Sequence, residues 1–211
     1  MALGALRDLL VSPRTFFEER PPGDLTAHAL GAVLLTALVT LVGVWALFRV
    51  PLAEMPPEGR RAFRRLFGAM LVLVPLVTLV GWGIVTGVVH LAVRNYAERA
   101  TFGRTFAVVG LAALVEIPVM LLGFVETYYL FQSVSFAEPR QATSQLQSAS
   151  GGDSPLAILA WAVVTLWKGY IWREGLLGAY DLPADRATLA AGAAVAVSLV
   201  LAVRPVNLGL G

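Results

Sequence analysis

The chain has no cysteine, and charged residues make up only 14% of its 211 residues. The absence of cysteine excludes disulfides, thiolate metal sites and cysteine nucleophiles. Ordinary soluble domains are about one-quarter charged, so these charges are too few to cover a soluble globule of this size. We therefore do not expect a soluble enzyme, and the sequence offers no catalytic motif and no cofactor-binding motif.

Histidine and lysine are also rare: there are two histidines, and Lys168 is the only lysine among sixteen basic residues. His28 and His90 lie far apart in the sequence, which argues against a histidine-rich metal site. The positive charges are spread over the connecting segments, whereas a nucleic-acid binder gathers them on one face. Nucleic acid is therefore not an expected partner. The bias toward arginine is typical of a GC-rich, prokaryotic genome.

Apolar residues are what the chain has in abundance. They make up 57% of it, and the mean hydropathy is +0.73. A helix rises about 1.5 Å per residue, so about 20 apolar residues cross a hydrocarbon core of about 30 Å. The sequence predicts an all-α, polytopic membrane bundle in one domain, residues 1–211, embedded in the lipid bilayer. The five predicted transmembrane helices cover about 25–50, 66–93, 105–131, 155–180 and 186–204.

Two segments outside these spans are more polar than the spans. Residues 132–154 are rich in Ser, Gln, Ala and Gly, which predicts a flexible polar loop. Residues 1–24 carry charges that rule out a signal peptide, and their spacing predicts two short amphipathic helices. Within that segment, Phe16 and Phe17 either anchor the helices at the headgroup boundary or pack under the bundle.

Gly83 and Gly87 form a small-xxx-small pair inside the second predicted span. In a membrane, such a pair lets two helix backbones approach closely. We therefore predict a helix-packing contact at this stripe.

Glu116 is the sharpest polar feature within a span. It lies about 18 Å of helix rise beyond Arg104, near the bilayer centre, where a carboxylate costs several kcal/mol unless it is paired, wetted or protonated. Pro118 leaves the Leu114 carbonyl without its helical donor, one turn from the carboxyl group. Glu116 is either a proton- or ligand-linked site or a structural, hydrogen-bonded residue. The structural interpretation is favoured because no carboxylate next to Glu116 in the span forms a pair with it.

Lys168 admits two positions. It lies only five residues from Arg173, so its amine can reach the interface, or it can partly bridge the distance to Glu116. Its neighbours form the aromatic belt that is typical of the membrane interface: Trp167, Tyr170 and Trp172.

The arginines do not decide the orientation, because eight lie on one side of the predicted bundle and seven on the other. Three motifs are more informative. They are residues 12–17 (SPRTFF), residues 102–106 (FGRTF, followed by Gly110 and Pro118) and residues 172–182 (WREGLLGAYDL, running on to Arg186 and Ala187). Together they resemble the prokaryotic proteins of the Yip1-domain family.

The resemblance implies five spans, a cytoplasmic N-terminus and a place in the cell membrane. Eukaryotic relatives assist vesicle traffic and contact Rab-type GTPases. We therefore expect a non-enzymatic integral membrane protein that organises membrane or partner proteins, other copies of itself included. The alternative is a permease or transporter subunit with an intramembrane site at Glu116.

Overall fold

The computed structural model describes residues 3–20, 22–54, 57–97, 100–134 and 155–207, and these residues form helices and short connections without a strand. This confirms the predicted all-α class. The elements are α1 (Leu3–Val11), α2 (Pro13–Glu18), α3 (Pro22–Glu54), α4 (Pro57–Val93), α5 (Phe102–Leu111), the 3₁₀ helix η1 (Ala112–Val115), α6 (Glu116–Gln132), α8 (Pro155–Tyr180) and α9 (Ala184–Asn207).

Three stretches among the described residues are long and apolar enough to cross a membrane: Leu25–Arg49, Phe67–Val93 and Phe102–Gln132. Many large apolar side chains on them are exposed, as expected for helices solvated by lipid. The structure is therefore that of a helical membrane bundle. The spans predicted at 155–180 and 186–204 correspond to α8 and α9 and stay a prediction. The predicted loop falls mostly on residues 135–154, outside the described residues.

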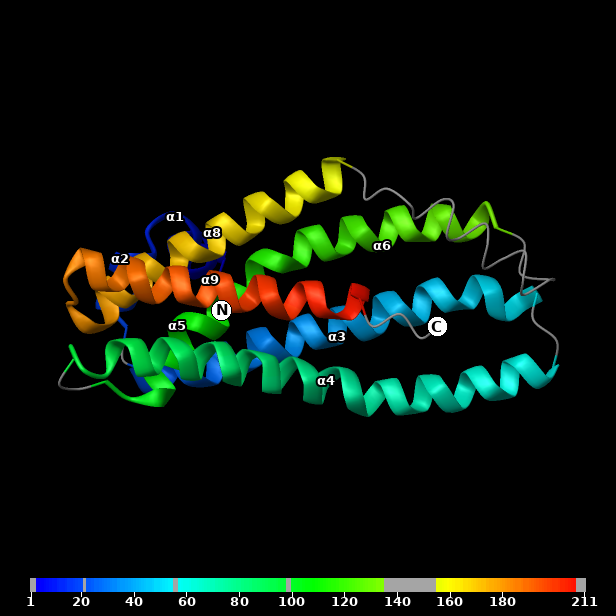
Figure 1. Ribbon diagram of the computed structural model, residues 1–211, viewed down its shortest axis with the longest axis horizontal. Helices are drawn as coiled ribbons and strands as arrows, with labels where there is room; N and C mark the ends of the chain where they lie inside the picture. Colours follow the sequence, from blue (N-terminus) through cyan, green and yellow to red (C-terminus); the bar gives the residue numbers. More distant parts are fainter. Residues whose placement is uncertain (1–2, 21, 55–56, 98–99, 135–154, 208–211) are drawn as a thin grey trace.

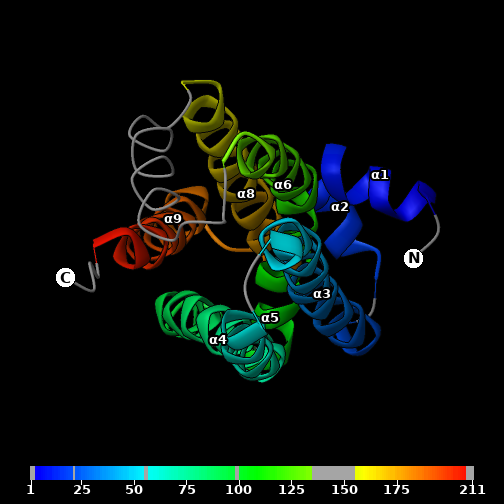
Figure 2. The same cartoon turned by 90° about the vertical axis from the view of Figure 1, so that its right-hand side faces the viewer.

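The long helices run side by side along one axis (Figure 1), and the end-on view shows α5 in the middle of the bundle (Figure 2). The burial of α5 agrees with this position, since its residues from Ala107 to Leu111 are all buried. Helices α1 and α2 lie on the outside of the bundle at one end, where α2 packs against α8.

The core is built largely from small side chains, which allow the helices to pack closely. A Cβ placed on Gly110 of α5 would lie 3.2 Å from the Ala29 Cβ of α3. By contrast, a Cβ placed on Gly83 or Gly87 would have no atom within 4 Å among the described residues beyond its own stretch of helix. The close contact predicted at those two glycines is thus not made within the described residues, and it stays a prediction.

The third span is interrupted where α5 passes into α6. Ala112–Val115 form a 3₁₀ turn, and α6 begins directly afterwards at Glu116. Pro118 explains the break, because its ring clashes with the carbonyl four residues earlier and cannot donate to it. That carbonyl, on Leu114, instead accepts from the Glu116 N–H, which also donates to Ala113. The break places Glu116 at the first turn of a new helix, facing the bundle.

Candidate functional site

Glu116 and Lys168 meet inside the bundle. The Lys168 ammonium of α8 donates to the Glu116 carboxylate at the start of α6, and the two side chains are 8% and 17% exposed, respectively. Of the two positions that the sequence left open for Lys168, the structure has the one that reaches Glu116. The opposite charges offset each other's burial cost, which neither residue could bear alone at this depth.

Two tryptophans complete the surroundings of Lys168. Its Nζ lies 4.9 Å from the ring centroid of Trp82 and 5.1 Å from that of Trp172. The two rings meet edge to face with centroids 6.4 Å apart, and the Trp172 Nε1 donates to the Val109 carbonyl oxygen at 3.2 Å. The ring faces thus add cation–π attraction to the ion pair.

The position of Trp172 corrects the sequence interpretation. It was predicted in the interfacial belt with Trp167 and Tyr170, which are indeed exposed, but Trp172 is fully buried. The spacing of four residues from Lys168 places both on one helix face and was the available signal. Trp82, on α4, carried no signal that linked it to this cluster.

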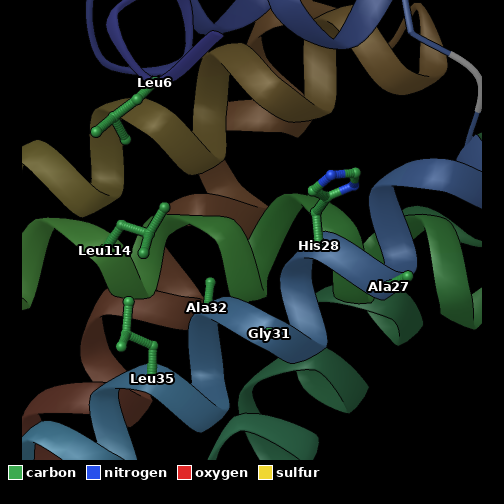
Figure 3. A pocket seen from close by; sticks show the side chains of 7 residues that line it. All are labelled: Leu6, Ala27, His28, Gly31, Ala32, Leu35 and Leu114. Atoms are coloured by element: carbon green, nitrogen blue, oxygen red, sulfur yellow. The ribbon is translucent and has the colours of Figure 1, made fainter. Parts of the chain in front are cut away.

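Neither Glu116 nor Lys168 is among the described residues that line a nearby pocket in the bundle. That pocket has a volume of about 500 Å³ and lies between α1, α3 and η1 (Figure 3). The described residues that line it are apolar apart from the imidazole of His28: Leu6, Ala27, His28, Gly31, Ala32, Leu35 and Leu114. Such a lining suits an apolar group better than a polar substrate.

Phe16 and Phe17 lie inside the protein, the second of the two positions that the sequence left open. Their rings are 1% and 2% exposed and stack edge to face with centroids 5.1 Å apart. Opposite them, α8 presents two glycines. A Cβ placed on Gly175 would meet the Phe17 ring, and one placed on Gly178 would meet the Arg14 backbone. Both glycines are therefore needed for α2 to sit this close to α8.

A chain of polar contacts joins α4, α5 and α8 beside this packing. The Thr105 hydroxyl shares a hydrogen bond of 2.8 Å with the Tyr180 hydroxyl and lies 3.3 Å from Nδ1 of His90. The Tyr180 hydroxyl also donates to the Thr101 carbonyl at 3.1 Å, and the Arg104 guanidinium lies over the Tyr180 ring. His90 is thus a hydrogen-bonding partner at a helix end.

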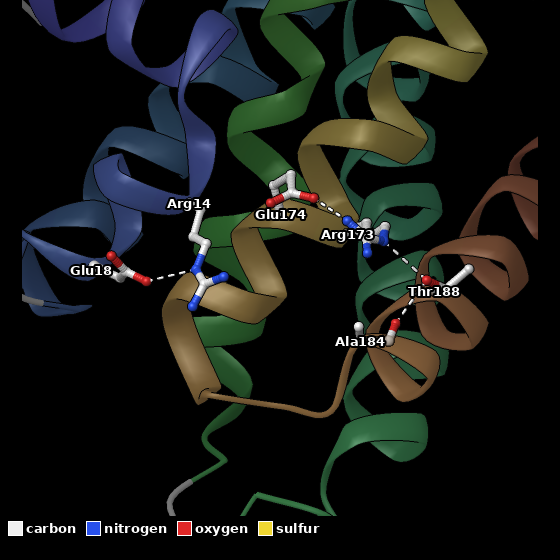
Figure 4. Close-up of polar contacts among 6 residues, drawn as sticks. All are labelled: Arg14, Glu18, Arg173, Glu174, Ala184 and Thr188. Carbon is white, nitrogen blue, oxygen red and sulfur yellow. Dashed lines mark hydrogen bonds and ion pairs between the residues drawn. The ribbon is translucent and has the colours of Figure 1, made fainter.

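Charged side chains cover the outside of the same end (Figure 4). The Arg14 Nε donates to Glu18 at 2.8 Å, and this contact raises the pKa of Arg14. On α8, Arg173 pairs with Glu174 and donates to the Thr188 hydroxyl of α9 at 3.0 Å. The Arg14–Glu18 pair is about half exposed, so it adds little stability and leaves its charges available to a partner, whereas Arg173 and Glu174 are more deeply buried.

Comparison with known families decides what the chain is. The family profile described as the Yip1 domain matches residues 7–204, almost the entire sequence. The chain belongs to the Yip1 domain family. No curated protein and no solved structure gives a match. The family supports a non-enzymatic membrane protein.

The three motifs that resemble Yip1 proteins come together at one end of the bundle. Residues 13–17 lie in α2, residues 102–106 begin α5, and residues 172–180 form the last turns of α8. We call this region the motif end. Its residues make the Phe16–Phe17 packing and the Thr105–Tyr180 contact described above. The motifs therefore build one structural unit. In the described ranges, no three His, Asp or Glu side chains are grouped so that they could hold a metal ion.

Proposed function

We propose that this Yip1-domain protein organises membrane or partner proteins from its motif end, with the N-terminus in the cytoplasm. The observation that carries the proposal is the seating of α2 on α8. Burial of Phe16 and Phe17 holds a short helix outside the spans in one position, so its charged residues form a fixed surface rather than a loose tail. A fixed surface binds a partner without first losing conformational entropy.

The alternative, a permease or transporter subunit built on Glu116, has less support. The Glu116 carboxylate is paired with Lys168, and neither that residue nor its partner lines the pocket under α1. A transported cation or proton would first have to displace a buried ammonium group.

The orientation is tested by thiol labelling, for which a chain without cysteine is well suited. Asn95 lies beyond the end of α4 near the motif end, and Ser133 lies beyond α6; both are exposed. We expect a membrane-impermeant thiol reagent to label Ser133→Cys and not Asn95→Cys in intact cells, and both variants after lysis. The reverse pattern would place the N-terminus outside, and labelling of both in intact cells would contradict the number of spans between them.

The organising role is tested by site-specific photo-crosslinking in native membranes. A photoreactive residue replaces Asp8 or Glu18 at the motif end, or Glu58 at the start of α4 as a matched exposed carboxylate. We expect a discrete adduct at the first two positions and none at Glu58. The adduct should disappear when Arg14→Glu reverses the neighbouring charge. If no adduct forms at the motif end, or if the same adduct also forms at Glu58, the proposed surface is wrong.

A further inference from the structure

Four arginines occupy the first turns of α4, at the end of the bundle opposite the motif end. All four are exposed, and their spacing of one and four residues gathers them on one side of the helix: Arg60, Arg61, Arg64 and Arg65. Among the described residues, their only ion pair joins Arg61 to Glu58 at 3.5 Å, with both side chains more than 70% exposed. Like charges four residues apart destabilise a helix, so a bound anion would offset the repulsion within this arginine cluster.

A small pocket adjoins the arginine cluster. Its volume is about 230 Å³, and it is lined by α3 and α4: Trp45, Phe48, Leu52, Arg64 and Phe67. Among the described residues that line it, Arg64 is the one that is charged, and the others are aromatic or aliphatic. Arg49 lies next to it, with its guanidinium 4.8 Å from the Trp45 ring centroid. The pocket thus combines a cationic side with an apolar side.

The pocket lies where two apolar stretches end. The first candidate span stops at Arg49, and the second starts at Phe67. Trp45 and Phe48 are in the last turns of the first stretch, whereas Arg64 lies just outside the second. Hydrocarbon gives way to lipid headgroups at such a boundary, where tryptophan and arginine are favoured. The charged headgroup of an anionic lipid lies at this boundary, and so at the level of the pocket.

We propose that this pocket binds the phosphate of an anionic phospholipid. The planar guanidinium of Arg64 matches a phosphate with two parallel hydrogen bonds, and the rest of the arginine cluster supplies the attractive field. Because a water molecule takes about 30 Å³ of liquid, the pocket has room for the phosphate and the adjoining glycerol but not for the acyl chains. Those chains lie along apolar side chains exposed on α3 and α4, such as Val42 and Leu71. This site is independent of the motif end.

The test uses quenching of tryptophan fluorescence by bromine. The protein is placed in phosphatidylcholine nanodiscs that contain a minor share of either phosphatidylglycerol or phosphatidylcholine with brominated tails. The signal of Trp45 is the difference between the wild type and Trp45→Phe. We expect brominated phosphatidylglycerol to quench Trp45 more than brominated phosphatidylcholine does at the same share. Equal quenching by the two lipids would show no preference for the anionic headgroup and would overturn the proposal.

Substitutions of Arg64 test whether its guanidinium binds the lipid phosphate. Arg64→Gln is expected to weaken phosphatidylglycerol binding about tenfold or more, since a charge-assisted hydrogen bond is lost, and Arg64→Lys should restore part of it. Arg94→Gln, an exposed arginine at the other end of α4, is the matched control and should bind as the wild type does. Retained binding in Arg64→Gln would overturn the assignment.

Inorganic phosphate separates a lipid site from a site for free phosphate. Added at the concentration of the lipid phosphate, it should leave the quenching unchanged, because it cannot occupy the apolar side of the pocket. If it abolishes the preference for phosphatidylglycerol, the pocket binds free phosphate and the lipid assignment is wrong.

Discussion

Replacing Lys168 by methionine is expected to lower the free energy of unfolding by about 3–5 kcal/mol. The substitution keeps the length of the side chain but leaves the Glu116 carboxylate buried without its cation. An unpaired buried charge keeps its full desolvation cost. Denaturant titration in detergent, followed by tryptophan fluorescence, measures the loss.

The double substitution Lys168→Met with Glu116→Gln is expected to recover most of that stability, because neither charge then remains. Glu126→Gln removes an exposed carboxylate from the same helix and serves as the control, with little expected change. A Lys168→Met protein as stable as this control would show that the buried pair does not support the fold. The permease alternative has a different signature: Glu116→Gln would fold normally and abolish a proton- or cation-coupled flux in proteoliposomes.

The second large effect is expected at the seat of α2. Burial of Phe16 and Phe17 contributes roughly 3–6 kcal/mol, at about 1.5–3 kcal/mol for each side chain. Replacing both by serine should release the N-terminal segment while the spans stay inserted. Limited trypsin digestion of inverted vesicles measures this as faster cleavage at Arg14 and Arg20. Val11→Ser, at an exposed position of the same segment, should leave the cleavage rate unchanged.

Gly178→Ala tests the same contact from the other helix. The added methyl group would meet the Arg14 backbone, which cannot move aside as a flexible side chain can. We expect trypsin to cleave the segment faster in this variant also. Gly192→Ala adds the same group where no atom of the described residues lies within 4 Å, and it should behave as the wild type. Rapid cleavage of the wild type itself would contradict the fixed surface on which the proposed function depends.

Hydropathy and motif spacing predicted the helical membrane class, because crossing a bilayer restricts both composition and length. The pair of short N-terminal helices also follows from a local signal, a charge-interrupted apolar pattern. The break near Pro118 has a local signal too, a missing amide donor, although one continuous span was predicted there. Such features are encoded within a few neighbouring residues, so a single sequence is enough to find them.

Features that depend on distant residues were not predictable in the same way. Whether Lys168 reaches the interface or Glu116 is decided by how α8 is turned relative to α6, and no local pattern contains that angle. The contact of Trp82 with Lys168 was equally unpredictable. So was the role of Gly175 and Gly178, which depends on α2 lying against them. Gly83 and Gly87 have the spacing of a packing motif, yet the helices of the described chain meet at other glycines.

The 3₁₀ turn at Ala112–Val115 divides one span into two halves with different surroundings. The half before it, α5, is surrounded by protein, with six of its ten residues buried, whereas α6 after it has no fully buried residue and exposes large apolar side chains such as Leu122 and Tyr129. Tolerance to substitution should follow this division. In α5 side-chain volume is limiting, so that adding even one methyl group is felt. In α6, apart from Glu116 and the contact of Phe124 with Gly43, an apolar side chain is the main requirement. The two halves of this membrane crossing therefore restrict their residues differently: side-chain shape limits substitution in α5, whereas hydrophobicity is the main limit in α6.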